Sequence, residues 1–326
     1  MDKKYEVLLD DKQGNVWDIT DVVVELTWKT TRIGSPGSLD FTLIKSSPFQ
    51  DASCQVNNGD IVSFQYDNRN VFYGYVFAID YGQDETVRIK CYDQIRYLMN
   101  KDTYIFTQVT ASDVIKRIAD DFKLKIGKIA DTKYQIPTMV EDNQTLLDII
   151  DKALILTLWN TGKNYVLYDD FGALALRDVN EMLLDFYIGD HSLMTDFMLK
   201  SSIDQETYNK IKLYRDNQKA GKREVYIAQD SANIAKWGVL QLTQSVDDDK
   251  NEAQISALLD QLIILRNRET KSLQIEAIGD VRVRAGCFVP IVISELGINQ
   301  PFLVDEATHR FSGNDYTISI TLKVIG

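Results

Sequence analysis

The stretch Gly59-Asp60-Ile61-Val62-Ser63-Phe64 decides the fold, because a glycine followed by alternating apolar residues is typical of a half-buried strand that leaves a turn. A polar turn follows it, and then come two more strand-like runs, Phe72–Ala78 and Thr86–Lys90. The same order begins again near the C-terminus, where Gly286 precedes the run Phe288–Val292. The pattern predicts a three-stranded unit that occurs twice in one chain.

The spacing of the two units is similar. The second unit continues with a run that begins at Phe302 and with Thr317–Thr321. Phe72 follows Gly59 by 13 positions, and Phe302 follows Gly286 by 16. The differences fall in turns, where inserted residues cost little free energy. The repeat predicts two barrel-like domains of one type, and the alternative is a chance likeness, since three-strand patterns are common in β proteins.

The rest of the first 98 residues is also strand-like. Tyr5–Leu9 and Val16–Ile19 flank a polar turn and predict a hairpin. Val22–Trp28 alternates in polarity, as a half-buried strand does. The tract Ile33–Ser38 is a loop by composition, and the alternating run Leu39–Leu43 follows it. The loop is a candidate for a contact with another subunit or a partner protein, and a plain surface loop is the alternative.

The period changes near residue 110. Thr110 and Asp113 resemble a capping box, and apolar residues then recur at helical spacing as far as Phe122. A second helix is predicted from Asn143 to about Asn160, with Gly162 as its C-terminal cap. Two strands joined by a turn at residues 169–172 follow these helices. The sequence therefore predicts an α/β insert over residues 99–194.

Strand patterns return after about residue 195. Asn209–Tyr214 and Val225–Ala228 predict a hairpin, and Glu252–Arg266 predicts a third helix with one apolar face. Four strand-like runs follow the helix, at residues 272–277, 288–293, 302–306 and 316–324. A helix between strands is expected to close one end of a small barrel. The predicted fold class is α+β and mainly β, with β domains over residues 1–98 and 195–326 on either side of the insert.

The composition excludes some functions. The 326 residues carry a formal net charge of −12, whereas nucleic-acid binding through phosphates needs a basic patch. The nearest candidate is Lys219–Arg223, which a solvated loop explains better. Cys54, Cys91 and Cys287 have no metal-ligand spacing and predict reduced thiols, as in a chain folded in the bacterial cytoplasm. No apolar run approaches the ~20 residues of a membrane-spanning helix, and the first residues lack the apolar core of a signal peptide.

The search for catalytic chemistry yields no site. His191 and His309 are far apart in sequence, and neither has a histidine or cysteine at metal-ligand spacing. The run Asp247–Asp249 suits a solvated segment before a helix, and Asp169-Asp170 suits a hairpin turn. Phosphate-loop, dinucleotide-binding and nucleophile-elbow motifs are missing from the sequence. We therefore predict no catalytic residue, no metal ligand and no cofactor. The tryptophans are dispersed and are expected in the core or at interfaces; they are Trp17, Trp28, Trp159 and Trp237.

Several stretches resemble the XkdQ/YqbQ-type tail proteins of contractile phages and phage-derived bacteriocins, which are similar to baseplate hub proteins of the late-control-D group. The resemblance covers nearly the whole chain, and it depends on the order and spacing of packing and turn residues. The matching stretches are Ile19–Asp21 with Trp28, Gly34–Phe41, Asn58–Val62, Phe72–Val76, Tyr92–Leu98, Thr161–Lys163, Ala277–Asp280 and Val283–Gly286.

The resemblance implies a structural baseplate hub that forms a homotrimer and is not an enzyme. Two tube-like β-barrel domains per subunit would give six similar units in a ring, which would join the six-fold tail tube to a three-fold central spike. The implied partners are further copies of the chain, the tube protein, the spike and other baseplate or tape-measure proteins. The particle would be a released virion or a bacteriocin tail. Two alternatives stay open, a tail-associated cell-wall hydrolase and a carbohydrate- or peptide-binding adhesin.

Overall fold

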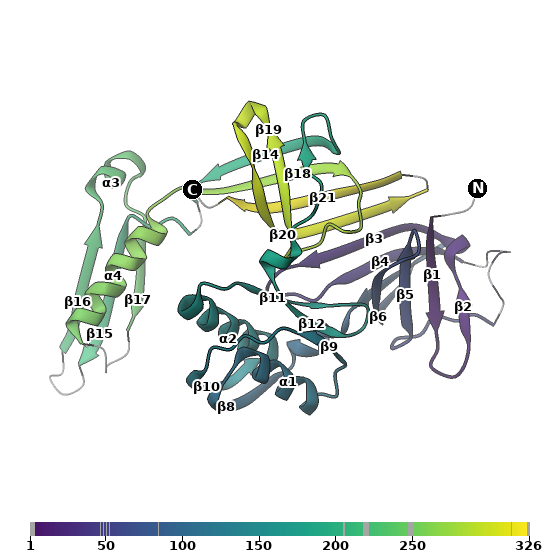
Figure 1. Cartoon of the computed structure of the whole chain (residues 1–326), viewed down its shortest axis with the longest axis horizontal. Coiled ribbons are helices and arrows are strands. Elements are labelled where there is room, and N and C mark those ends of the chain that lie inside the picture. The colour runs from purple at the N-terminus through teal and green to yellow at the C-terminus, as the bar shows by residue number, and fades with distance from the viewer. Residues whose placement is uncertain are drawn as a thin grey trace. The chain divides into compact units, whose positions relative to one another are not determined.

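The computed structural model describes residues 4–45, 47, 49, 51, 53–83, 85–204, 206–217, 222–246, 251–313 and 315–324. Strand accounts for 51% and helix for 22%, so the prediction of a mainly β fold is confirmed. The chain divides into two compact units (Figure 1). The larger unit holds the residues up to Phe197 together with Gln274–Leu322, and the smaller unit holds Met198–Leu273.

The first β region of the larger unit is an antiparallel sheet in the order β2-β1-β5-β6-β7-β4-β3. The predicted hairpin at the N-terminus is confirmed, since Leu9 of β1 pairs with Trp17 of β2. Alternate residues of β4, Leu39 and Phe41 among them, are buried as predicted. The elements are β1 (Tyr5–Asp10), β2 (Val16–Asp18), η1 (Thr20–Val22), β3 (Val23–Thr31), β4 (Ser38–Ile44), β5 (Ile61–Tyr66), β6 (Arg69–Tyr81), β7 (Thr86–Tyr92) and η2 (Gln94–Met99).

The middle of the chain forms an α/β substructure of the larger unit. Two small sheets, β10-β8 and β11-β12-β9, accompany two helices that share a core of aliphatic side chains. The capping box predicted for the first helix is present, because Thr110 Oγ1 accepts a hydrogen bond from Asp113 N and the Asp113 carboxylate accepts one from Thr110 N. The elements are β8 (Lys101–Val109), α1 (Ala111–Asp121), β9 (Ile126–Ile129), β10 (Ile136–Thr145), α2 (Leu146–Thr161), β11 (Tyr165–Asp169), β12 (Leu174–Asp178) and η3 (Val179–Met182).

The predicted start of the second helix at Asn143 is wrong. Strand β10 continues to Thr145, whose side chain caps α2 by accepting a hydrogen bond from Asp148 N at 3.1 Å. The predicted C-terminal cap is confirmed, since Gly162 has φ +69°. The β8–β10 pair escaped prediction because β8 buries only Phe106 and carries little apolar alternation.

The second β region lies around Gly286, and most of it belongs to the larger unit, whereas residues 198–202 and 270–273 belong to the smaller one. Its sheet order is β14-β18-β21-β20, β20 also pairs with β19, and β13 pairs with β19 in parallel. The predicted strands at residues 272–277, 288–293, 302–306 and 316–324 all exist, and most of them are longer than predicted. The elements are β13 (Ile188–Gly189), β14 (Met194–Ser202), β18 (Thr270–Ile278), β19 (Phe288–Ile293), η4 (Ser294–Leu296), β20 (Ile298–Ser312) and β21 (Asp315–Val324).

The main part of the smaller unit is a three-stranded sheet covered by one helix. Its strand order is β16-β15-β17, and Ile211 and Leu213 of the central strand are buried with Ile255 and Leu259 of α4. The third helix has the predicted bounds, but the expectation that it closes a barrel is wrong, since it packs on this open sheet. The elements are β15 (Lys210–Asn217), β16 (Lys222–Gln229), α3 (Ser231–Trp237), β17 (Gln241–Ser245) and α4 (Glu252–Arg266).

The barrel architecture is not confirmed. Among the residues that the structure describes, no sheet closes into a barrel. The two β regions instead share one continuous sheet, because β3 of the first pairs with β20 of the second. The predicted boundaries near residues 98 and 194 stay a prediction, since the division into two compact units follows different positions.

Candidate functional site

The two β regions repeat a distinctive pair of hydrogen bonds at their glycines. Gly59 N donates to Val76 O at 2.8 Å, and Gly286 N donates to Val304 O at 2.9 Å. Both glycines have a positive φ, +93° and +90°, a conformation that L side chains rarely adopt. The glycine that opens each unit is therefore required by the backbone, and it fixes where the next long strand passes.

The strands that follow also share an irregularity. The pairing of β6 with β7 shifts register between Val76 and Ala78, and the pairing of β20 with β21 shifts between Val304 and Glu306. A bulge is a specific local feature that bends and twists a strand. Its recurrence next to the glycine contact makes β5-β6-β7 and β19-β20-β21 equivalent, with Ala78 matching Glu306. This match places Phe72 against Gln300, so the predicted correspondence of Phe72 with Phe302 is wrong by two residues.

The junction of the two regions centres on Trp28 of β3 and His309 of β20. These residues are direct cross-strand partners, and their ring centroids are 4.5 Å apart. His309 Nε2 lies 2.8 Å from Val283 O, and Nδ1 lies 2.7 Å from Tyr316 Oη. A carbonyl only accepts, so Nε2 carries the proton and Nδ1 accepts from the tyrosine hydroxyl.

His309 is thereby a neutral packing residue. It is completely buried, and burial lowers the pKa of its imidazole to about 3. Both ring nitrogens are occupied by hydrogen bonds within the protein, which leaves neither for a metal ion or a substrate.

Polar contacts line the remainder of the junction. Thr30 Oγ1 accepts a hydrogen bond from Ala285 N at 2.9 Å, and both residues are buried. Arg32 Nε donates to Asp305 Oδ1 at 2.6 Å, and Arg32 N donates to Asp305 O at 2.9 Å. These bonds add to the register that the buried face of β3 already specifies against the second region.

A buried polar cluster joins three sequence segments behind this junction. Asp93 accepts hydrogen bonds from Gly37 N at 2.9 Å and Ile95 N at 3.0 Å. Arg284 donates to Asp169 O at 3.2 Å. Burial, followed by the nearby Asp169 carboxylate, raises the pKa of Asp93, and burial raises the pKa of Asp169 to about 6. The cluster connects the first region, the insert and the second region, and distance in sequence hid it from prediction.

The other residues that were considered for catalysis or binding lie in exposed turns or outside the described residues. His191 lies in an exposed turn with φ +60°, and Asp170 is exposed beside the buried Asp169. Asp247–Asp249 lie outside the described residues, as do Lys219 to Gly221. Within the described ranges, no group of three or more histidine, cysteine, aspartate or glutamate side chains could hold a metal ion. The search for a long apolar helix, over the same residues, gives no candidate membrane span.

The tryptophans divide between core and surface, whereas the cysteines are all buried. Trp28 is buried, Trp17 packs partly buried against the first core, and Trp159 is largely exposed. Lys236 Nζ lies 5.0 Å from the ring centroid of Trp237. All three cysteines are buried free thiols; burial raises the pKa of Cys91 and raises that of Cys287 to about 11.

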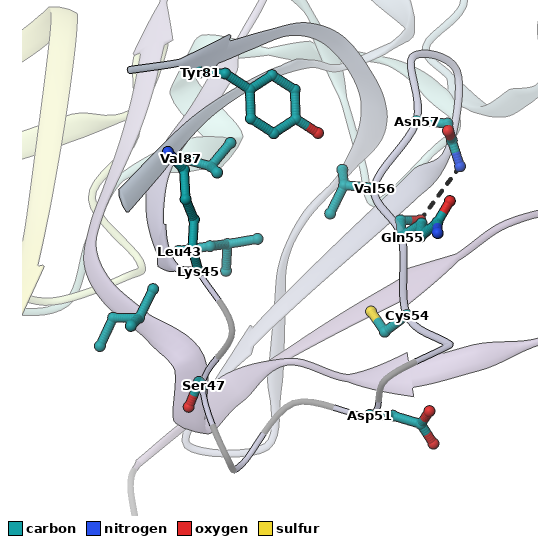
Figure 2. A pocket seen from close by; sticks show the side chains of 11 residues that line it. Leu43, Lys45, Ser47, Asp51, Cys54, Gln55, Val56, Asn57, Tyr81 and Val87 are labelled. Atoms are coloured by element: carbon teal, nitrogen blue, oxygen red, sulfur yellow. Dashed lines mark hydrogen bonds between the residues drawn. The ribbon is translucent and has the colours of Figure 1, made fainter. Parts of the chain in front are cut away.

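One open pocket of about 660 Å³ lies at the end of β6 (Figure 2). Tyr81, Val87, Leu43 and Val56 surround its apolar part, and their side chains face the opening (Figure 2). Tyr81 is largely exposed to solvent, at 70%. The rest of the lining is mostly polar and includes Lys45, Ser47, Asp51, Cys54, Gln55 and Asn57.

Solved tail proteins have the same fold. The 43 kDa tail protein of prophage MuSo2 from Shewanella oneidensis is 13% identical with a TM-score of 0.69, covering 97% of this chain and 98% of that chain. The tail protein from Neisseria meningitidis MC58 is also 13% identical, with a TM-score of 0.66 over 99% of this chain and 97% of that one. The fold is thus that of phage tail proteins.

Closer relatives give the family. The chain is 34% identical over 292 residues to the phage-like element PBSX protein XkdQ of Bacillus subtilis (strain 168), covering 89% of this chain and 88% of the relative. The model of the YQBQ-like family matches residues 26–323. The chain belongs to the YQBQ-like family. The predicted resemblance is confirmed.

Proposed function

We propose that this chain is the structural hub of a contractile phage tail or a phage-tail-like bacteriocin, a trimeric adaptor between the six-fold tail tube and the three-fold central spike. The observation that carries the proposal is the pair of equivalent β units in one chain, joined edge to edge by β3 and β20. The two β units meet through different surfaces, β3 on the first and β20 on the second. When units that meet in this way follow one another around an axis, they form a closed ring if their rotations add up to a full turn.

Three copies would supply six equivalent β units. A six-unit ring matches a six-fold tube on one face, while the three-fold repeat of whole chains matches a three-fold spike on the other. In that ring, the β regions would act as tube-like domains even though neither is a closed barrel within one chain. The net charge of −12 suits a ring whose channel does not bind nucleic acid.

Quantitative mass spectrometry of purified particles tests the stoichiometry. The proposal predicts three copies of this chain for every six copies in one ring of tube protein. A ratio of one to one would make the chain a tube or peripheral baseplate component.

The proposed role is not enzymatic. Asp93 and Asp169, whose pKa values are raised by burial, lie in the interior and do not line the pocket, and His309 has both ring nitrogens occupied. Purified chain is therefore expected to release no fragments from peptidoglycan. Cleavage that a single alanine change at His191, His309, Asp169 or Asp248 abolishes would instead establish a cell-wall hydrolase.

A further inference from the structure

The last residues of β6, 78–81, are paired on only one side among the strand pairs that the structure describes. In β20, residues 306–312 pair with β21 on one side and with β3 on the other. In β6, the equivalent residues 78–81 pair with β7, whereas the pairing with β5 ends at Tyr75. Among the pairs that the structure describes, residues 78–81 therefore lack the neighbour that β3 provides in the second region.

Strand β14 is the equivalent of β3. The order β14-β18-β21 mirrors β3-β4-β7, and both β3 and β14 have nine residues. Their sequences agree position by position: Glu-Leu-Thr-Trp-Lys-Thr-Thr at 25–31 stands against Asp-Phe-Met-Leu-Lys-Ser-Ser at 196–202. The neighbouring strands β4 and β18 are also alike, because Ser38-Leu39 of β4 corresponds to Ser272-Leu273 of β18. Leu199 thus corresponds to Trp28, and Lys200 corresponds to Lys29.

The outer edge of β14 is open. This strand stands at the end of its sheet and pairs with β18 alone among the described strands. Two of its apolar residues are exposed, Met198 at 60% and Leu199 at 41%. An edge strand with exposed apolar side chains is a template for pairing with another chain.

The pairing of β3 with β20 within the chain gives the register in which β14 would pair with β6. Trp28 lies opposite His309, and Lys29 lies opposite Thr308. The equivalents of these two pairs are Leu199 opposite Tyr81 and Lys200 opposite Asp80. Both members of the first pair are exposed apolar residues, and the second pair has opposite charges, which favours direct cross-strand neighbours.

The pocket at Tyr81 fits the same arrangement. In the second region, the ring of Trp28 covers His309, next to Val283. Tyr81 and Val56 are the equivalents of His309 and Val283, and both line the open pocket in Figure 2. The pocket is the place where the counterpart of Trp28, Leu199, would pack.

The hydroxyl of Ser201, which donates to Glu269 Oε2 at 2.7 Å, can still accept a hydrogen bond and would add a polar contact of the same kind. Ser201 corresponds to Thr30, whose Oγ1 accepts a hydrogen bond from Ala285 N in the segment before Gly286. The equivalent donor in the first region is the backbone N–H of Asn58, directly before Gly59.

We propose that β14 of one copy adds to the free edge of β6 of the next copy, with Lys200 opposite Asp80 and Leu199 opposite Tyr81 over the pocket. The proposal rests on the proposed ring and specifies its contact between chains. Each copy contributes one β14 edge and one β6 edge, so the contact propagates in one direction and closes when the ring is complete.

Thiol cross-linking in assembled particles tests the register. The double variant D80C/K200C is expected to give chains linked in twos and threes with a short thiol-to-thiol linker, because opposed cross-strand Cα atoms lie only ~4.5–5.5 Å apart. The native thiols are buried and form a low background. The matched control D80C/K163C, which places the second thiol at an exposed lysine of the insert, is expected to give only single chains.

Charge reversal gives a second readout if the cysteine variant assembles poorly. D80K and K200D are each expected to lower the yield of particles by about threefold to tenfold, and the double variant D80K/K200D to restore it. Three copies per particle with neither cross-linking nor rescue would overturn this register and leave the hub function standing. A different copy number would overturn the hub function itself.

Discussion

At the scale of single residues, the buried carboxylates Asp93 and Asp169 lie where segments distant in sequence meet. Asp93, Asp169 and Arg284 come from the first region, the insert and the second region. The sequence indicated a turn at Asp169 and gave no reason for its burial, because the residues that bury it are far away along the chain. Gly37 was predicted only as part of a loop, whereas a Cβ there would lie 2.5 Å from Asp93 Oδ2.

The raised pKa of Asp169 predicts a pH-dependent stability. Its pKa in the folded chain is about 6 and its ordinary value is 3.8, so the folded chain holds this proton more tightly. The resulting stabilisation is complete below pH ~4 and is lost as the pH rises through ~6. D169N keeps the oxygen that accepts from Gly172 N and stays neutral, so its stability relative to wild type should rise by on the order of 1 kcal/mol from pH 4 to pH 7.

Denaturant unfolding of both proteins across this pH range measures the difference. D170N changes an exposed carboxylate in the same turn and serves as the control, with no such trend expected. A constant difference between D169N and wild type would contradict a proton held at Asp169.

Gly37 gives a second prediction at this scale. G37A forces the Asp93 carboxylate away from the Gly37 N–H, because the new methyl group overlaps it. The expected loss of stability is about 1–3 kcal/mol, since a buried hydrogen-bonded carboxylate loses a partner. S35A, at an exposed position of the same loop, should change the thermal midpoint little. Equal midpoints for G37A and S35A would show that Asp93 can move freely.

At the scale of elements, periodic apolar patterns predicted the helices and strands that bury one face. Helix α4 has the predicted bounds, and α1 has the predicted capping box. Elements with little buried apolar surface escaped prediction: α3 buries no residue, and β17 has no fully buried residue. The start of α2 was misplaced because a Thr145 cap was overlooked and the polar end of β10 has no strand pattern.

The two threonine caps predict unequal effects. Thr110 is buried and takes part in a reciprocal capping box, whereas Thr145 caps α2 from a less buried position. T110A should cost about 1–2 kcal/mol and T145A about 0.5–1 kcal/mol, since both remove a cap but only the first also leaves buried polar groups unpaired. Thermal unfolding of the two single variants measures this order, and a larger effect for T145A would contradict it.

At the scale of the whole molecule, the sequence predicted a duplication and a family, and it missed the junction. The Gly59 and Gly286 pattern indicated two β units, and matching glycine contacts and bulges support their equivalence. The pairing of β3 with β20 could not be predicted, because it joins residues about 280 positions apart. The signal that was present is the likeness of residues 25–31 to 196–202, which marks β3 and β14 as equivalent edges.

An averaged cryo-electron microscopy reconstruction of the intact particle tests the central claim most directly. The account predicts three copies of this chain around the tail axis, whose six β units form one ring coaxial with the tube, with β14 of each copy beside β6 of the next. Six copies in the ring, or a single copy away from the axis, would contradict the role of symmetry adaptor.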